Sequence, residues 1–522
     1  MRSGLLLLSG LAFVMRADAQ TTPTWAEDIA PIFYNNCTKC HNTNGIANMY
    51  PLITYSEAVS IAPMIQYNVT NGIMPPWPPD TTYKRLAHER ILSPAEVAAI
   101  DAWVNGGTPS GNLSNAPTPP VYNTGATMTN PTVDLTMPVY TVNTTTDLYR
   151  CFVIPSGVGT TQYIKEIEII PGNRQIVHHV LAYQDTSQTP VNLDNNDPGP
   201  GYTSFGGVGS NTAELIGGWV PGDAGIARYP VGMGVKFLAN SYIILQIHYP
   251  GGITNQVDST RILLKLQGGS MREVYLDPIL NHVTNITPAL IIPANQVKSF
   301  SEQYFVPINV SLISIAPHMH LIGQKIKSYA VDPNGDTIPL INIPKWDFHW
   351  QGFYNFRKVT KIPMNSWLKA EATYDNTVNN PNNPNNPPQT VVAGESTTDE
   401  MMIVYFAWTY YLPGDENIIL DSSAVLGVEN NPDMIVTPQL YAPYPSPAND
   451  EVTVDFYLPE KSTVSIELYD MTGKLVASPI EEKEFASGSN TCMVNIKNLS
   501  SGIYLVKLRT GDTVRTKKVV KE

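Results

Sequence analysis

Histidines gather at three places in this sequence, with spacings suited to holding metal ions. Five of the nine histidines form these groups, namely the adjacent pair His178-His179, the single His248 and the ends of the triplet His318-Met319-His320. Alternate side chains of a strand point to the same face, so His318 and His320 can grip one ion. His178 and His179 would point to opposite faces of a regular strand, so both reach one ion only if the chain bends or leaves the sheet there. We expect metal ligands here rather than ordinary polar histidines.

Two cysteines and a further histidine form a second kind of chemical motif, Cys37-Thr38-Lys39-Cys40-His41. This is the C-x-x-C-H spacing of covalent haem attachment, in which two thiols add to the two vinyl groups and the adjacent imidazole becomes an axial ligand. The alternative is a redox pair or half of a zinc site. No second C-x-x-C completes a zinc site, and no βαβ pattern indicates a thioredoxin. The sequence therefore predicts one covalently bound haem c.

The second axial ligand of this haem should follow downstream, and Met74 is the best placed candidate. It lies in the segment Gly72–Trp77, whose prolines hold the loop extended. Met49 and Met64 are the alternatives and are expected to be core residues. Ligation by Met and His raises the haem potential, which suits electron transfer rather than oxygen chemistry. The surrounding segment, residues 20–107, resembles the class I cytochrome c domains.

The metal expected at the other histidines is copper. Imidazole suits copper and zinc alike, but the thioether of Met401, within Asp399-Glu400-Met401-Met402, favours copper, particularly Cu(I). A neighbouring haem would be of no use to redox-silent zinc. His88, His282 and His349 are isolated in the sequence, and we assign them no role.

The bulk composition indicates several strand-rich domains. A chain of 522 residues should hold about three to five domains. Its 43% hydrophobic content can fill their cores, while abundant Gly, Pro and Tyr favour short strands and turns. The formal charge of -13 argues against a nucleic-acid partner, which would need a basic face.

The first residues predict export. Arg2, the apolar run Leu5–Val14 and Ala17-Asp18-Ala19 have the form of a signal peptide, residues 1–19. We find no candidate transmembrane span, so the mature protein should be soluble or surface-attached. The chain is poor in disulfides, because Cys151 and Cys492 lie far apart in different segments.

The local patterns divide the chain into a helical part and several β parts. The expected helices, the last opened by a capping box from Ser93 to Glu96, are Glu27–Tyr34, Ser56–Gln66 and Ala95–Val104. A Pro- and Thr-rich linker, residues 108–132, precedes short β-branched runs that continue to about 440. The clearest strands expected in the whole chain are Tyr163–Ile170, Tyr242–His248, Ile262–Leu266, Ile403–Tyr411, Val452–Leu458, Thr463–Tyr469 and Ile503–Leu508. The Asn/Pro run Asn376–Pro388 is expected to be an ordered or mobile loop.

Residues 133–440 resemble the copper type II, ascorbate-dependent monooxygenases, the family of the peptidylglycine and dopamine beta-monooxygenases. The resemblance rests on the order and context of the three histidine groups and of the Asp-Glu-Met triplet. It implies two jelly-roll-like domains that each hold one copper ion. A solvent cleft would separate the two ions, and ascorbate would be a reductant. The implied ligands are His178, His179 and His248 for one copper, and His318, His320 and Met401 for the copper that activates O2. Gln246 and Tyr405 match positions that line the cleft in the family.

Two departures from the family bear on the substrate. Peptide-amidating members carry an arginine two residues before the His-x-His pair, where this chain has Ala316. The cleft asparagine two residues after the Met is Ile403 here. A peptide C-terminus is therefore a poor expectation for the substrate, which stays an unidentified small-molecule or peptide-like compound.

Residues 441–522 resemble the type IX secretion sorting domain of Bacteroidetes. The matching pieces are Tyr444–Ala448, Gly473–Val476, Ser501–Leu508 and Lys517–Val520. The alternative is a generic adhesion or carbohydrate-binding sandwich. The sorting domain implies export through the type IX machinery, with the protein secreted or held at the outer-membrane surface.

These expectations describe a multidomain chain: an all-α cytochrome c domain (20–107), a linker (108–132), two all-β jelly-roll-like sandwiches (133–275 and 276–440) and a C-terminal all-β sandwich (441–522). The expected function is that of a secreted copper monooxygenase, an oxidoreductase that hydroxylates a substrate C–H bond with O2. Its electrons would come from an external donor through the fused haem c. The alternative is a non-enzymatic haem/copper electron-transfer or copper-binding surface protein.

Overall fold

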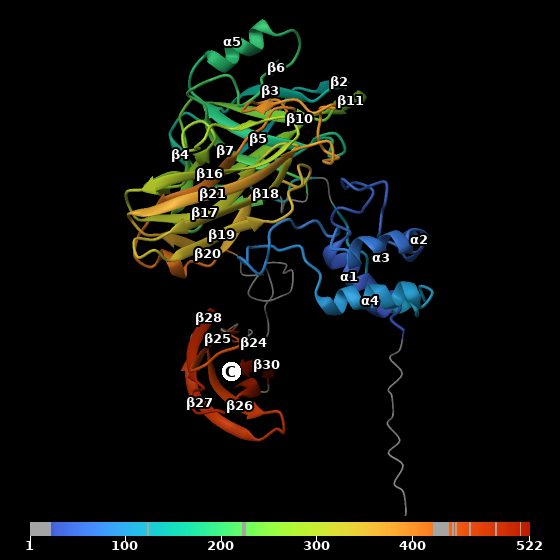
Figure 1. The fold of residues 1–522 in the computed structure, drawn as a ribbon, viewed down its shortest axis with the longest axis vertical. Helices are drawn as coiled ribbons and strands as arrows, with labels where there is room; N and C mark the ends of the chain where they lie inside the picture. The colour runs from blue at the N-terminus through green and yellow to red at the C-terminus, as the bar shows by residue number, and fades with distance from the viewer. Residues whose placement is uncertain are drawn as a thin grey trace, which may run out of the picture. The chain divides into compact units, whose positions relative to one another are not determined.

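The computed structural model describes residues 22–122, 125–221, 226–420, 438–440, 443, 446–458, 461–485, 488–511 and 513–522. The predicted signal peptide, residues 1–19, lies outside these ranges. Most of the regular structure is β-sheet, as the composition predicted, and it forms several separate sheets (Figure 1). None of the helices in the described ranges combines the length and hydrophobicity that a membrane span requires.

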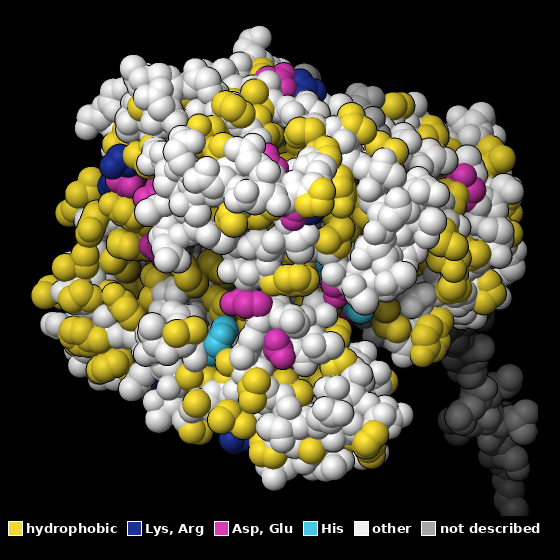
Figure 2. All heavy atoms as spheres, turned by 90° about the horizontal axis from the view of Figure 1, so that it is seen from above, with side chains coloured by type: hydrophobic (Ala, Val, Ile, Leu, Met, Phe, Trp, Pro, Cys, Tyr) yellow, Lys and Arg dark blue, Asp and Glu magenta, His cyan; other side chains and the backbone are white. Residues whose placement is uncertain are grey.

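The chain forms two compact units, each built from several stretches of sequence. The first contains Met1–Pro78, Arg90–Arg228 and Leu238–Leu266, and the second contains Pro79–Glu89, Tyr229–Phe237 and Gln267–Glu522. Charged side chains are scattered thinly over the face shown in Figure 2, where hydrophobic and uncharged polar atoms predominate. This matches the low charged content of 15%.

The helices before residue 106 form one small cluster (Figure 1). They are η1 (Trp25–Ile29), α1 (Ala30–Asn36), α2 (Tyr55–Ser60), α3 (Ala62–Thr70) and α4 (Pro94–Asn105). The predicted capping box opens α4, since Ser93 accepts from the Glu96 amide and the Glu96 carboxylate accepts from the Ser93 amide. Trp25, Phe33 and Trp103 fill the core, with ring centroids 5.4 to 6.3 Å apart. The small helical segment is confirmed at the level of its elements.

One sheet of the first unit has β10 (Tyr242–Tyr249) as its central strand. Its order is β6 (Tyr202–Thr203), β3 (Leu148–Pro155), β10, β5 (His179–Asp185) and β7 (Glu214–Trp219). Other strands of this unit are β1 (Val133–Thr136), β2 (Tyr140–Thr144), β4 (Gln162–Ile170), β8 (Ile226–Arg228), β11 (Ile253–Asp258) and β12 (Arg261–Gln267), with α5 (Thr189–Asn196) and η2 (Leu113–Asn115) between strands or before them. All but one residue of β10 are buried, as a central strand requires.

The second unit contains two four-stranded antiparallel sheets before its C-terminal part. One has the order β14 (Tyr275–Asn281), β23 (Ile403–Tyr410), β17 (Val310–His318) and β20 (Tyr354–Ile362). The other has the order β16 (Gln296–Val306), β21 (Ser366–Asn376), β18 (Gly323–Val331) and β19 (Thr337–Ile343). Shorter elements are β9 (Met233–Phe237), β13 (Arg272–Glu273), β15 (Ile291–Ile292), β22 (Val391–Val392) and η3 (Asp415–Asn417). Every second residue of β21 is buried, which is the pattern of a strand with one core face.

The Asn/Pro run is an ordered loop, held by side-chain amides. The Asn376 amide is fully buried and donates to the carbonyls of Ile292 and Gln389 at 2.9 and 2.7 Å. Asn383 in turn donates to the Asn376 side-chain oxygen at 2.9 Å. These bonds replace the backbone ladder that prolines prevent.

Residues 79–89 leave the helical segment and pack within the second unit. Leu86 is fully buried and bridges to Phe356 of β20, and the Ala87 amide donates to the Asn355 carbonyl at 2.8 Å. Arg357 donates to the Leu86 carbonyl at 3.0 Å and pairs with Glu89 at 3.1 Å. The predicted boundary at residue 107 therefore does not coincide with the change from one compact unit to the other.

The C-terminal part has its own sheets and its own core. The strands are β24 (Gln439–Leu440), β25 (Glu451–Leu458), β26 (Ser462–Asp470), β27 (Leu475–Phe485), β28 (Gly488–Asn495), β29 (Gly502–Thr510) and β30 (Thr513–Lys521). Their buried side chains, including Phe456, Ile466 and Leu508, form a separate hydrophobic cluster. The predicted motif residues Tyr444 and Pro445 lie outside the described ranges.

Candidate metal centres

The first candidate centre lies where β5 begins beside β10. His248 of β10 pairs directly with His179, the first residue of β5. His178 precedes the strand, and its amide donates to the His248 carbonyl at 2.9 Å. The chain thus leaves the sheet between the two neighbouring histidines, which is the condition for both to reach one ion.

The three side chains converge closely enough to share one metal. Their ligand nitrogens all lie within 4.8 Å of one another. His178 Nδ1 lies 3.2 Å from His179 Nδ1 and 3.2 Å from His248 Nδ1. With metal–nitrogen bonds of about 2.0 Å, such a separation corresponds to an angle of roughly 105° at the ion, near the tetrahedral value. The donor set and its spacing therefore fit a bound copper or zinc ion.

The surroundings of His248 fix the orientation of its ring. Tyr149 of β3 stacks on it, with ring centroids 4.3 Å apart and planes 3° from parallel. His248 Nε2 lies 3.5 Å from an Asp147 carboxylate oxygen, which leaves Nδ1 facing the other two histidines. A carboxylate on the far nitrogen is the usual way in which a protein orients a histidine ligand.

Gln246 lies on the same face of β10 as His248 but its amide is already engaged. The side chain is buried and donates to the carbonyls of Ser204 and Gly207 at 3.2 and 2.6 Å. Phe205, between these residues, lies 5.3 Å from the Tyr149 ring. In this structure Gln246 anchors the loop beside the three histidines.

The second candidate centre lies at the end of β17. His318 is the last residue of this strand and pairs with Ile403, the first residue of β23. The His318 and His320 rings lie 5.1 Å apart. Met401 stands two residues before Ile403, and both Met401 and His320 are buried. The fold therefore brings these three predicted residues to the same end of two paired strands.

The Asp-Glu-Met triplet holds the backbone and ring of His320. The buried Glu400 carboxylate accepts hydrogen bonds from the amides of His320 and Ile322 at 2.9 and 2.8 Å. Burial raises the pKa of Glu400 to about 8, although these backbone bonds oppose the shift. The Asp399 carbonyl lies 3.1 Å from His320 Nδ1, so Nε2 is the nitrogen left for a metal.

A segment between β19 and β20 supplies contacts that the sequence did not predict. The Gln351 side-chain oxygen hydrogen-bonds His318 Nδ1, and Trp346 Nε1 donates to the His320 carbonyl at 3.2 Å. The Phe348 ring meets the His320 ring edge to face at 6.1 Å. The sequence offered only a local aromatic cluster here, and nothing in it links residue 351 to residue 318.

The face of the sheet that carries His318 is largely apolar nearby. Ala316 and His318 point to the same side of β17, and their partners Tyr405 and Ile403 point to that side of β23. Ala316 and Ile403 are each 8% exposed. Burial raises the pKa of Tyr405 to about 12, so its hydroxyl stays protonated at neutral pH.

The C-x-x-C-H motif forms a tight turn at the end of α1. The amides of Cys40 and His41 both donate to the Cys37 carbonyl, at 3.1 and 3.0 Å. His41 Nδ1 lies 2.8 Å from the Tyr50 carbonyl, which leaves Nε2 for an axial bond. Burial raises the pKa of Cys37 to about 12, which is unsuited to the low-pKa thiolate of a redox pair. The free thiols of Cys37 and Cys40 and the fixed imidazole therefore fit covalent haem attachment.

The three candidate methionines differ in exposure. Met49 is 81% exposed and Met64 is 40% exposed, so neither is the core residue that the sequence suggested. Met74 is half-buried, and its amide donates to the Asn68 carbonyl at the end of α3. The role of Met74 as the second axial ligand stays a prediction.

Comparison with known families identifies two parts of the chain. Residues 278–423 match the C-terminal domain of the copper type II ascorbate-dependent monooxygenases. This range contains His318, His320 and Met401. Residues 442–522 match the secretion system C-terminal sorting domain. The chain therefore carries a copper monooxygenase-type domain and the type IX sorting domain by which Bacteroidetes-type bacteria export proteins.

Whole-chain comparisons add no functional information. None of the curated proteins matches the chain. A β-glucuronidase from Faecalibacterium prausnitzii is 10% identical, with 43% of this chain and 37% of that chain covered and a TM-score of 0.13. A DUF4785 family protein from Legionella pneumophila is 13% identical, with 73% and 90% covered and a TM-score of 0.11. The chain spans about a third of the length of the β-glucuronidases first matched. Structural similarity this weak says nothing about the function of this chain.

Proposed function

We propose that this protein is a secreted copper-dependent monooxygenase that hydroxylates a substrate C–H bond with O2. The observation that carries the proposal is the convergence of His178, His179 and His248 in a chain whose residues 278–423 match a copper monooxygenase domain. The pair His318 and His320, with Met401 at the same end of β17 and β23, supports it.

The proposed ligands divide into two sets. His178, His179 and His248 would hold one copper, and His318, His320 and Met401 would hold the other. Copper bound at these sites would supply the one-electron steps and the O2 activation that oxygen insertion needs. Gln351 and the Asp399 carbonyl hydrogen-bond the Nδ1 atoms of the second set, which would leave their Nε2 atoms to hold the metal.

The apolar side chains of Ala316 and Ile403 beside His318 favour a substrate whose apolar part contacts this face of the sheet. The side chains of Ala316 and Ile403 offer no charge or hydrogen-bond donor to a substrate carboxylate, and Tyr405, the partner of Ala316, is a polar side chain on that face. Tyr405 would hold a substrate oxygen by donating its hydroxyl proton. We propose an unidentified small-molecule or peptide-like substrate that is not bound through a terminal carboxylate.

We further propose that electrons reach the copper sites through a haem c attached to Cys37 and Cys40, with His41 and Met74 as axial ligands. The turn geometry, the fixed His41 ring and the half-buried Met74 support this assignment. Ascorbate or another external donor would reduce the protein. If O2 consumption does not require copper, the alternative of a non-enzymatic electron-transfer protein is favoured.

Metal analysis combined with O2 consumption tests the proposal. The mature protein should contain two copper ions and one haem iron per chain, and reduced protein should consume O2 in step with hydroxylation of a substrate. His318→Ala should abolish O2 consumption while the three-histidine site keeps its copper. His349→Ala is the matched control, because this side chain is 72% exposed and bonded to Asp347. Zinc-only protein from copper-replete cells would refute the proposal.

A further inference from the structure

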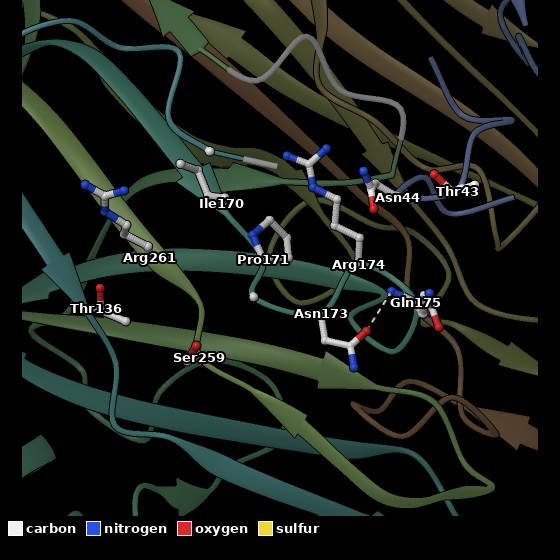
Figure 3. A pocket seen from close by; sticks show the side chains of 12 residues that line it. Thr43, Asn44, Thr136, Ile170, Pro171, Asn173, Arg174, Gln175, Ser259 and Arg261 are labelled. Carbon is white, nitrogen blue, oxygen red and sulfur yellow. Dashed lines mark hydrogen bonds between the residues drawn. The ribbon is translucent and has the colours of Figure 1, made fainter. Parts of the chain in front are cut away.

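A cavity of about 430 Å³ lies within the first unit, between the loop that follows the C-x-x-C-H motif and the loop that precedes the histidine pair. Thr43 and Asn44 come from the first loop and Gly172–Gln175 from the second (Figure 3). Ser259 and Arg261, at the start of β12, line a further wall. The volume falls within the range of about 300–1,000 Å³ that small-molecule sites occupy.

Arg174 is the side chain in this cavity whose bonding is incomplete. Its Nε is buried and makes no hydrogen bond within the described part of the chain. A buried donor without a partner is destabilising, so such an atom is normally satisfied by water or a ligand. In the view of Figure 3, the Arg174 side chain extends from its loop to the level of Asn44 on the other loop.

The other ionised groups around the cavity already have partners: Arg261 pairs with a carboxylate, and Asp258 accepts hydrogen bonds from neutral donors. Arg261 forms a two-pronged ion pair with Asp134 of β1, with Nε 2.6 Å from the carboxylate. The Asp258 carboxylate accepts from the Asn173 amide at 2.8 Å and from the Tyr249 hydroxyl at 2.8 Å. Among the described residues that line the cavity there is no Asp or Glu. Within the described part of the chain, Arg174 is therefore a cation of this cavity without a carboxylate partner.

The remaining polar lining is rich in neutral groups that can meet hydroxyls. Thr43, Thr136 and Ser259 carry hydroxyls, and Asn44 and Asn173 carry amides. Close packing of the two walls depends on Gly172, since a Cβ there would lie 2.6 Å from the Ser259 amide nitrogen. The cavity thus combines one cation with several hydroxyl and amide partners in a fixed frame.

We infer that this cavity binds a small organic anion bearing several hydroxyl groups, with Arg174 as its charge partner and Asn44 on the opposite wall. A single guanidinium matches a single carboxylate or similar anionic group. The hydroxyl and amide lining matches the rest of a polyol chain better than a bare inorganic ion. Arg174 stands four residues before His178, and Asn44 stands three after His41, so an occupant would touch both of the loops that carry candidate ligands.

Calorimetric titration of the full chain with gluconate, after a chelator has removed copper, tests the inference. Gluconate should bind, sorbitol should not, and added NaCl should weaken the affinity. Arg174→Gln should weaken gluconate binding roughly tenfold or more, because a charge-assisted bond is worth about 1.5–3 kcal/mol. Asn44→Ala should weaken it less. Arg228→Gln, at an exposed arginine paired with Glu166 outside the cavity, should leave it unchanged.

The inference would be overturned by no gluconate binding at tens of millimolar, by equal binding by Arg174→Gln, or by equal binding of sorbitol. Inorganic phosphate that binds as well as gluconate would mean a general anion site and would also overturn it. Because the titration uses copper-free protein and reads binding alone, its result does not depend on the proposed monooxygenase activity. A chain that hydroxylates nothing would still give the same binding result.

Discussion

One side-chain amide sets the orientation of the ring of His318. The Gln351 oxygen hydrogen-bonds Nδ1 and so leaves Nε2 for a metal. Gln351→Leu should lower copper affinity at this centre about 10–100-fold, the usual cost of removing an outer partner of a ligand histidine. Competition with a copper chelator measures the change. Gln303→Leu, at an exposed glutamine of β16, is the matched control, and an equal loss in both variants would contradict the role.

A second prediction for a single residue concerns Glu302, whose burial should make the free energy of unfolding depend on pH. Its carboxyl is buried on β16 without a hydrogen-bond partner in the described residues, and burial raises its pKa to about 9. The folded protein therefore holds a proton that the unfolded chain releases above its ordinary pKa of 4.5. The stabilising contribution is complete below about pH 4.5 and is lost as pH rises toward 9, by up to about 1.4 kcal/mol per pH unit.

Urea unfolding between pH 5 and 9 compares this slope in three proteins. Glu302→Gln cannot titrate, so its free energy of unfolding should fall less steeply with pH than that of the parent. Glu371→Gln changes an exposed carboxylate on the neighbouring strand β21 and should keep the parental slope. Identical slopes in all three would mean that Glu302 is ionised in the folded protein.

At the scale of elements, the Asn/Pro loop is the least regular part of the second unit and yet is tightly bonded. Asn376→Ala removes the amide that joins the end of β21 to β15 and to Gln389. Three carbonyl partners lose their donor, so the variant should unfold about 1–3 kcal/mol more easily. Proteolysis in the loop should speed up in parallel. Asn379→Ala, at an exposed position of the same loop, should leave both measurements unchanged.

The regular elements were predictable because their patterns are local. Short β-branched runs predicted β4, β10, β23 and β26 to within two residues at either end, and the Ser93 capping box predicted the start of α4. The convergence of His178, His179 and His248 was also predictable, because few side chains other than histidine cluster for metal binding. That they bind metal stays a prediction. Even the break in the sheet at His178 followed from the alternation rule.

Contacts between distant segments were not predictable, since no local pattern encodes them. Gln351 meets His318 across 33 residues, and the amide of Gln246 turned out to hold a loop near residue 204. The exposure of side chains was not predictable from local sequence either. Met49 and Met64 were expected to be core residues and are exposed in the structure. Such outcomes depend on which surfaces the tertiary packing leaves uncovered.

At the scale of the whole molecule, the chain passes between the two compact units several times, so neither unit is a continuous stretch of sequence. Residues 79–89 show the consequence most clearly, because they follow the predicted haem loop yet extend the edge of β20. Leu86 is fully buried there beside the buried Phe356. The second unit should therefore depend for its stability on a segment that lies within the first hundred residues.

Leu86→Ala measures this dependence. Truncating a fully buried leucine costs about 2–5 kcal/mol, so the unfolding of the second unit should begin at lower urea concentration in the full chain. If the segment detaches before it is cleaved, the rate of cleavage within residues 79–89 by added protease should rise by the factor that corresponds to this loss of free energy. Leu113→Ala, at a leucine that is 53% exposed, is the matched control and should change neither measurement. Unaltered unfolding of Leu86→Ala would mean that residues 79–89 rest on β20 without stabilising it, and that the helical segment and the second unit fold independently.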